Sequence, residues 1–285
     1  VFAGGAINFG KASVDGAGNP VQLGALVTAA DRIEFQTTGL VRIGSGSVIA
    51  TSGTNSVIEL NAGGLEIAGS LLAGATISGT DVVYDGIGAD IVIHSTDMVD
   101  IGGQGIIAGV AQKVGGTLVA TGNIVINVED GPSDISFSIS AFSTLRTQTA
   151  TAEPADAAHS ISINAAQDIQ IYSAITALQV GADITLNSDE LILVDGLLDA
   201  ADQLTVIGGS DETGAGLILP AFVFETDGTG DLVLDGQGNP VRLQGGTLRT
   251  AVGGSIILGA DDKLVLSGVV GETFVNESGV EVATT

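Results

Sequence analysis

The sequence predicts an all-β protein, specifically a parallel β-solenoid with coils of roughly 20–25 residues. Three observations predict this fold. Short aliphatic runs bounded by Gly, Asn, Asp or Ser recur along the chain, similar runs return at nearly regular intervals, and no stretch has the sustained 3.6-residue apolar period of an amphipathic helix. The 43 glycines suit sharp corners between the strands.

The predicted strands are three to five residues long and rich in Ile, Val and Leu. A strand this short cannot stand alone, but stacking on an equivalent strand about 4.8 Å away pairs its backbone and buries its apolar side chains. The runs are LVRI at 40, VIEL at 57, LEIA at 65, IVIH at 91, IVINV at 124, ISFSI at 135, SISI at 160, IQIY at 169, ITL at 184, LILV at 191, LTVI at 204, LVL at 232, SIIL at 255 and LVLS at 264.

The runs form two interleaved series. One begins at Ile161, Ile184 and Leu204, and the other at Ile169, Leu191 and Leu217. Two strands per coil of roughly 22 residues would give about 13 coils and a rod of ~60 Å. We therefore expect residues 1–285 to form a single elongated solenoid segment.

A longer phrase also recurs, which indicates coils stacked on coils. INAAQDIQIYSAI from Ile163 and LGADDKLVLSGVV from Leu258 carry apolar residues at the same offsets, and LNAGGLEIAGSLL from Leu60 repeats the phrase one residue shorter. The matched pairs in the first two phrases are Ile169 with Leu264, Ile171 with Leu266, and Ile175 with Val270.

Composition excludes some classes of partner. Eight Lys and Arg against 33 Asp and Glu give a formal charge of −25, which repels nucleic acid and anionic lipid. No apolar run approaches the roughly 20 residues that span a bilayer, so we expect no membrane insertion. The opening VFAGGAINFG has no initiator Met and no signal-peptide core, so we interpret the chain as an internal fragment of a longer repetitive protein.

The phrases LNAGGLEIAGSLLAGATISG, GGTLVATGNIVIN and GGSIILGADDKLVLSG resemble the degenerate repeats of filamentous-haemagglutinin-type adhesins. These are large exoproteins of Gram-negative bacteria, and the similarity extends over most of the chain. The resemblance implies a right-handed parallel β-helix shaft, located outside the cell at the bacterial surface.

A D-G-x-G-N phrase occurs twice, at residues 15–19 and 235–239, and we favour a tight turn as its role. The alternative is a calcium loop, because carboxylate and amide oxygens beside glycines suit a hard cation. TDGTGDLVLDGQGN (226–239) loosely resembles the calcium-binding β-roll nonapeptide. The candidate ligands are Asp15, Asn19, Asp85, Asp90, Asp227, Asp231, Asp235 and Asn239.

The twin phrases also predict a long repeat. Asp15 and Asp235 lie 220 residues apart (235 − 15), while Phe2 and Phe224, and Leu26 and Leu248, lie 222 apart (224 − 2; 248 − 26). These offsets place a repeat boundary near residue 222.

The segment 141–160, AFSTLRTQTATAEPADAAHS, breaks the coil rhythm and is predicted to be a protruding loop. We favour a tolerated insertion over a binding surface, since loops lengthen at small entropic cost. His94 and His159, the two histidines, are expected at the surface.

The leading functional hypothesis is a non-catalytic extracellular shaft, structural or adhesive, that self-associates into fibres or joins neighbouring repeats of its own chain. A cell-surface or glycan receptor is the external partner it would take. One alternative is a calcium-stabilised surface-layer or β-roll module. Another is a polysaccharide lyase or hydrolase, which would need Asp clustered with basic residues; the five arginines, at 32, 42, 146, 242 and 249, are scattered along the sequence.

Overall fold

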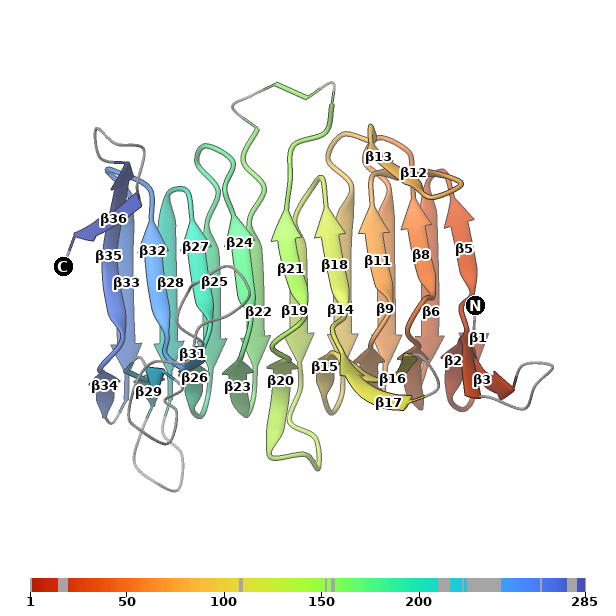
Figure 1. Cartoon of the computed structure of the whole chain (residues 1–285), viewed down its shortest axis with the longest axis horizontal. Coiled ribbons are helices and arrows are strands. Elements are labelled where there is room, and N and C mark those ends of the chain that lie inside the picture. Colours follow the sequence, from red (N-terminus) through yellow and green to blue (C-terminus); the bar gives the residue numbers. More distant parts are fainter. Residues whose placement is uncertain are drawn as a thin grey trace.

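The computed structural model describes residues 2–14, 20–107, 110–151, 153–154, 157–209, 216–221, 223–224, 242–261, 263–275 and 281–284. Throughout these residues the regular structure is β-strand, and no helix long and apolar enough to cross a membrane is found in them. The strands form three long sheets that wind around one core, and β1 and β36 lie at opposite ends of the long axis (Figure 1). The protein is a parallel β-solenoid, as the sequence predicted.

The first sheet has nine parallel strands within the described residues. They are β1 (Phe2–Ala3), β6 (Arg32–Thr37), β9 (Val57–Ala62), β14 (Asp90–Ser95), β19 (Ile124–Val128), β22 (Ile161–Ala165), β25 (Ile184–Ser188), β28 (Gln203–Gly208) and β33 (Ser255–Ala260). The second sheet also has nine described strands: β2 (Ile7–Phe9), β7 (Leu40–Ile43), β10 (Gly64–Ile67), β15 (Val99–Ile101), β20 (Ile135–Ile139), β23 (Asp168–Ile171), β26 (Ile192–Val194), β29 (Leu217–Leu219) and β34 (Leu264–Leu266).

The third sheet completes each coil. Its strands are β5 (Leu26–Ala29), β8 (Val48–Thr51), β11 (Ser70–Ala73), β18 (Thr117–Ala120), β21 (Thr144–Thr147), β24 (Ala174–Ala177), β27 (Leu197–Ala200), β32 (Thr247–Thr250) and β35 (Val269–Val275), with β36 (Glu281–Thr284) antiparallel to β35 at one edge. A coil therefore visits the first, second and third sheets in turn.

Alternation of side chains builds the core. Along β9 and β14 every second residue points inward and is buried, while the residues between them face outward. Stacked inward positions form continuous aliphatic columns, because equivalent residues of neighbouring coils pair directly. One column contains Phe35, Leu60, Ile93, Ile126, Ile163, Leu186 and Val206, all buried.

The repeated phrases correspond to real stacking. Ile169, Ile192, Leu217 and Leu264 occupy one column of the second sheet, so the predicted match of Ile169 with Leu264 is confirmed. Ile175 and Val270 likewise share a column of the third sheet. The predicted second series was wrong by one residue in the middle, because Ile192 rather than Leu191 stacks on Ile169.

The prediction of two strand series per coil was wrong, because it missed the third sheet. Each inward face there combines one large aliphatic residue with one small one, such as Leu118 with Ala120 and Leu198 with Ala200. Such strands lack the run of Ile, Val and Leu that marks the other two sheets. All predicted strands that fall within the described residues are strands of the first or second sheet.

Coils differ widely in length. Thr185 pairs with Thr205 after 20 residues (205 − 185), whereas Gln203 pairs with Ser255 after 52 (255 − 203). The predicted 13 coils were therefore too many: nine described strands in the first sheet correspond to a stack of about 40 Å. The longer coils carry insertions at their corners, which a constant period does not anticipate.

Several of these insertions are antiparallel hairpins. Three lie at the corner between the second and third sheets: β3 (Lys11–Val14) with β4 (Pro20–Leu23), β16 (Gly103–Ile107) with β17 (Val110–Val114), and β30 (Val223–Phe224) with β31 (Arg242–Gln244). A fourth, β12 (Ala75–Ser78) with β13 (Asp81–Tyr84), lies between the third and first sheets. It covers a second apolar cluster on the outside of the third sheet, formed by Ala50, Leu72, Ala75 and Val119.

The twin D-G-x-G-N phrases belong to two of these hairpins, although residues 15–19 and 235–239 themselves lie outside the described residues. Their flanking strands, β3–β4 and β30–β31, occupy the same corner of the solenoid. The 222-residue offset does not mark equivalent positions, however. Val27 rather than Leu26 shares a column with Leu248, and Phe2 and Phe224 lie in different kinds of element. Residue 222, the predicted boundary, is also outside the described residues.

A column of small residues forms the corner that enters the third sheet. It contains Ala25, Ser47, Gly69, Gly116, Ser143, Ser173, Gly196, Gly246 and Gly268. A Cβ on Gly116 would overlap the carbonyl oxygen of Ile67, and one on Gly69 would lie 2.6 Å from that of Ser47. Where serine stands instead, its hydroxyl bonds the neighbouring coil: Ser143 Oγ donates to the Ile101 carbonyl at 2.7 Å. Close approach of backbones therefore dictates the residue type here.

Candidate functional site

A column of polar side chains runs along the outer face of the first sheet. Asn164 Nδ2 donates to Asn127 Oδ1 at 3.0 Å, Asn187 Nδ2 donates to Asn164 Oδ1 at 2.9 Å, and Asn127 Nδ2 lies 3.5 Å from His94 Nδ1. Because these residues pair in register, the amides form a ladder across successive coils. The polar column consists of Gln36, Asn61, His94, Asn127, Asn164 and Asn187.

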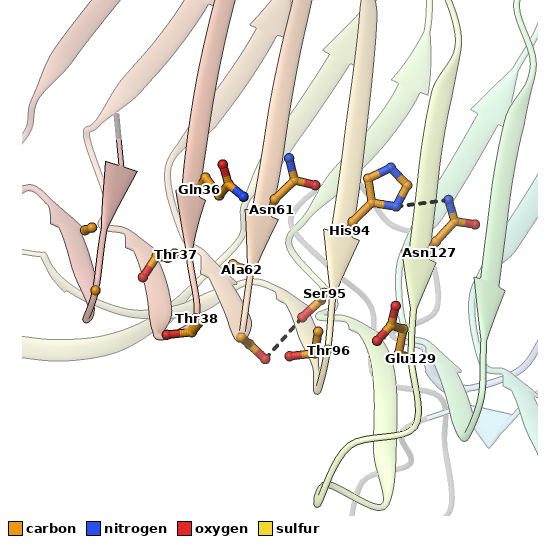
Figure 2. A pocket seen from close by; sticks show the side chains of 13 residues that line it. Gln36, Thr37, Thr38, Asn61, Ala62, His94, Ser95, Thr96, Asn127 and Glu129 are labelled. Carbon is orange, nitrogen blue, oxygen red and sulfur yellow. Dashed lines mark hydrogen bonds between the residues drawn. The ribbon is translucent and has the colours of Figure 1, made fainter.

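A groove lies beside the polar column, where the strands of the first sheet end. Its larger hollow, of about 740 Å³, extends from Gly4 to Glu129, and its smaller one, of about 310 Å³, extends from Asn127 to Asp189. The two hollows share Asn127 and Glu129, so they form one groove along the solenoid. Figure 2 shows the larger hollow, with Gln36, Asn61, His94 and Asn127 in a row on adjacent strands.

Small residues form the groove because they leave space between the coils. Ala62 and Gly63 line the larger hollow, and Ala165 and Ala166 line the smaller one. Hydroxyl side chains hold the adjacent corner: Ser95 Oγ donates to the Met98 carbonyl at 3.1 Å. The groove is thus a feature of the coil geometry, repeated from strand to strand.

The groove carries negative but no positive side chains. Glu129 and Asp189 are its carboxylates, and neither Lys nor Arg lines either hollow within the described residues. Its remaining polar groups are amides, hydroxyls and the His94 imidazole. It therefore offers hydrogen bonds with a modest negative potential.

Sequence reasoning missed this groove, although part of its signal was present. Asn61, Asn127, Asn164 and Asn187 each follow an aliphatic residue near the end of a predicted run, in LNA, INV, INA and LNS. The runs were interpreted only as core strands. Their outward residues become a site once stacking brings them into register.

Two of the eight predicted calcium ligands lie in described parts of the chain. Asp85 follows β13, and its Oδ1 accepts a hydrogen bond from Thr76 Oγ1 at 2.8 Å. Asp90 begins β14, and its Oδ1 accepts one from the Asn123 backbone N–H at 2.6 Å. Both carboxylates thus stabilise corners. The other six, which are Asp15, Asn19, Asp227, Asp231, Asp235 and Asn239, lie outside the described residues, and no metal-binding group of three or more His, Cys, Asp or Glu occurs within those residues.

Three arginines form ion pairs on three different sheets. Arg32 on the first sheet pairs with Glu34 and Glu59, and Arg42 on the second pairs with Glu66 at 2.6 Å. Arg249 on the third pairs with Asp199 of the preceding coil in the sheet. These pairs tie coils together, and the structure does not gather them into one basic cluster.

The predicted loop at 141–160 begins later than expected, because Thr144–Thr147 forms strand β21. The rest of the segment leaves the sheet, and the Thr151 N–H donates to the Tyr84 carbonyl of β13 at 2.8 Å. The expectation that His159 is exposed was wrong. Its side chain is buried, with Nε2 2.7 Å from Glu153 Oε1. His94 is exposed, as predicted.

The two tyrosines give a pH-dependent signal. Burial raises the pKa of Tyr84, and Arg146 offsets part of that rise; burial and then the charge of Asp195 raise the pKa of Tyr172. Both phenols should therefore ionise at higher pH in the folded protein than in urea, where they titrate near pH 10. Since the unfolded chain loses these protons first, stability falls as pH rises above about 10. Near-ultraviolet phenolate absorbance measures this directly, because the chain has two Tyr and no Trp; identical native and urea titrations would contradict it.

Comparisons of this chain with protein-family models, with curated proteins and with solved structures find no match. The fold is therefore established by the strand pairing itself. The resemblance to filamentous-haemagglutinin-type adhesins stays a prediction.

Proposed function

We propose that this protein is a non-catalytic extracellular shaft, a solenoid segment of a bacterial surface adhesin whose role is reach and stiffness. The observation that carries this proposal is the uninterrupted stacking of all three sheets along the molecule. Every interior strand is hydrogen-bonded on both sides, and its inward side chains belong to columns that continue through many coils.

Such stacking supports a mechanical role. Bending the solenoid would separate aliphatic columns on one side and compress close-packed side chains on the other, and protein interiors resist both. Ion pairs between coils, such as Arg42 with Glu66, add links on the outside. The same architecture accommodates stacking on neighbouring segments, because a solenoid coil pairs with whatever equivalent coil adjoins it.

Single-molecule fluorescence energy transfer tests the stiffness. The natural chain has no Cys, so Gly5→Cys and Ser255→Cys introduce two dye sites, both at exposed positions beside or in the first sheet. A stiff shaft gives one narrow distance distribution, near 40 Å for a stack of this many strands. The distribution should be the same with calcium and with chelator.

Other outcomes would contradict the proposal. A broad distribution in every condition would show that the coils do not form a shaft. Collapse of the distance in chelator would favour the calcium-stabilised module instead. Antibody labelling of intact source cells tests the surface location, and labelling only after permeabilisation would overturn it.

A further inference from the structure

We propose that the groove along the first sheet binds an uncharged polysaccharide chain. This goes beyond the shaft function, because it assigns a ligand to a particular surface. The groove combines a hollow of about 740 Å³, an adjoining hollow of about 310 Å³ and the polar column of amides and imidazole beside them.

The amide ladder has hydrogen-bonding capacity beyond the bonds that hold it together. A primary amide has two N–H donors and an oxygen with two lone pairs. Asn127 uses its Nδ2 toward His94 and its Oδ1 toward Asn164. Each such residue can still offer a donor and an acceptor to a ligand, which suits hydroxyl groups because these both donate and accept.

The ladder also holds these groups in fixed positions. Asn127 and Asn164 each contact the next polar side chain along the column, and they project from strands that are paired on both sides. A ligand therefore meets side chains whose conformational freedom is already reduced, which lowers the entropic cost of binding.

The shape of the groove fits a chain-like ligand. Its lining residues come from seven successive strands of the first sheet, from β1 to β25. With strands about 4.8 Å apart, this corresponds to a length of about 30 Å. A single small sugar would occupy only part of it, whereas an extended oligosaccharide can use equivalent groups on successive coils.

Charge argues for a neutral ligand. Glu129 and Asp189 line the groove without a basic partner among its lining residues, and the whole chain has a formal charge of −25. An acidic polysaccharide or a nucleic acid would be repelled. A carboxylate facing neutral hydroxyls instead accepts strong hydrogen bonds.

The backbone argues against an extended peptide. Peptides that lie along a sheet gain affinity by pairing with an exposed strand edge. The groove lies across interior strands such as β14, β19 and β22, whose edges are already paired in the sheet. Recognition there depends on side chains, and their chemistry matches sugar hydroxyls.

Affinity electrophoresis of the purified chain in native gels tests the inference. The gels contain galactomannan, xyloglucan or dextran as neutral chains, alginate as an acidic chain, or casein as an extended polypeptide. We expect retardation by at least one neutral polysaccharide and none by alginate or casein. The double variant His94→Ala and Asn127→Ala should weaken that binding at least tenfold, since it removes several hydrogen bonds at the middle of the groove.

Two further variants separate binding from folding. Thr96→Arg places a long side chain at an exposed groove position and should also block binding, while Asn8→Ala, an exposed asparagine on the second sheet, should leave it unchanged. Circular dichroism confirms that each variant is folded. The inference is overturned if no neutral polysaccharide retards the chain, if alginate or casein retards it more, or if both groove variants bind like the natural sequence. Because the dye-distance measurement involves none of these residues, either proposal can fail alone.

Discussion

Replacement of Ile126 by alanine is expected to lower the free energy of unfolding by about 3 kcal/mol, one of the two largest effects we predict for a single substitution. Ile126 is fully buried in β19, and it stacks between Ile93 and Ile163 of the neighbouring coils. Its truncation leaves a void that two columns of aliphatic side chains border. Paired strands on both sides prevent the backbone from collapsing into it, so the cavity persists.

Val125→Ala is the matched control, one residue earlier on the same strand but on its outward face. It should cost under about 1 kcal/mol. Urea unfolding followed by circular dichroism measures both variants. Equal losses would mean that the two faces of β19 are buried alike, which would contradict the arrangement of the solenoid core.

Gly116→Ala is expected to destabilise the protein by a similar amount, about 3 kcal/mol, even though it adds only a methyl group. The new Cβ would overlap the carbonyl oxygen of Ile67, which is backbone of the adjacent coil and cannot rotate away as a side chain does. Relief requires the two coils to separate locally at the corner before β18. That separation weakens the pairing of β18 with β11.

The control for this variant is Gly259→Ala in β33. Its Cβ would lie 3.5 Å from the Ile207 side chain, an ordinary van der Waals contact. Reduced freedom of the unfolded chain should then make this substitution neutral or slightly stabilising. Thermal unfolding of the two variants decides the matter, and a neutral Gly116→Ala would show that the corner column tolerates a Cβ.

The sequence was informative where large aliphatic residues alternate. Ile161, Ile184 and Leu204 were predicted to begin equivalent strands, and they pair directly in the first sheet. Alternation reveals such strands because one face is buried and the other is not. The third sheet was not predicted, since Ala120 and Ala200 fill inward positions there without the apolar signal of a larger residue.

The groove could not be predicted for a different reason. Asn127 and Asn164 lie 37 residues apart, while Asn164 and Asn187 lie 23 apart. The longer interval contains the 148–160 loop, so no constant period brings these residues together. Only the pairing register shows that they form one ladder, and only the stacked backbone shows the hollow beside them.

The variable coil length also has a consequence for engineering. Because the described strands stay in register whether a coil holds 20 residues or 52, the spacing between stacked strands is independent of how much polypeptide joins them. A foreign peptide spliced into a corner, for instance into the turn of β12–β13, would change the outline of the molecule without moving the strands. The solenoid is accordingly a display scaffold, on which epitopes or enzymes can be mounted at set intervals of about 4.8 Å along one axis.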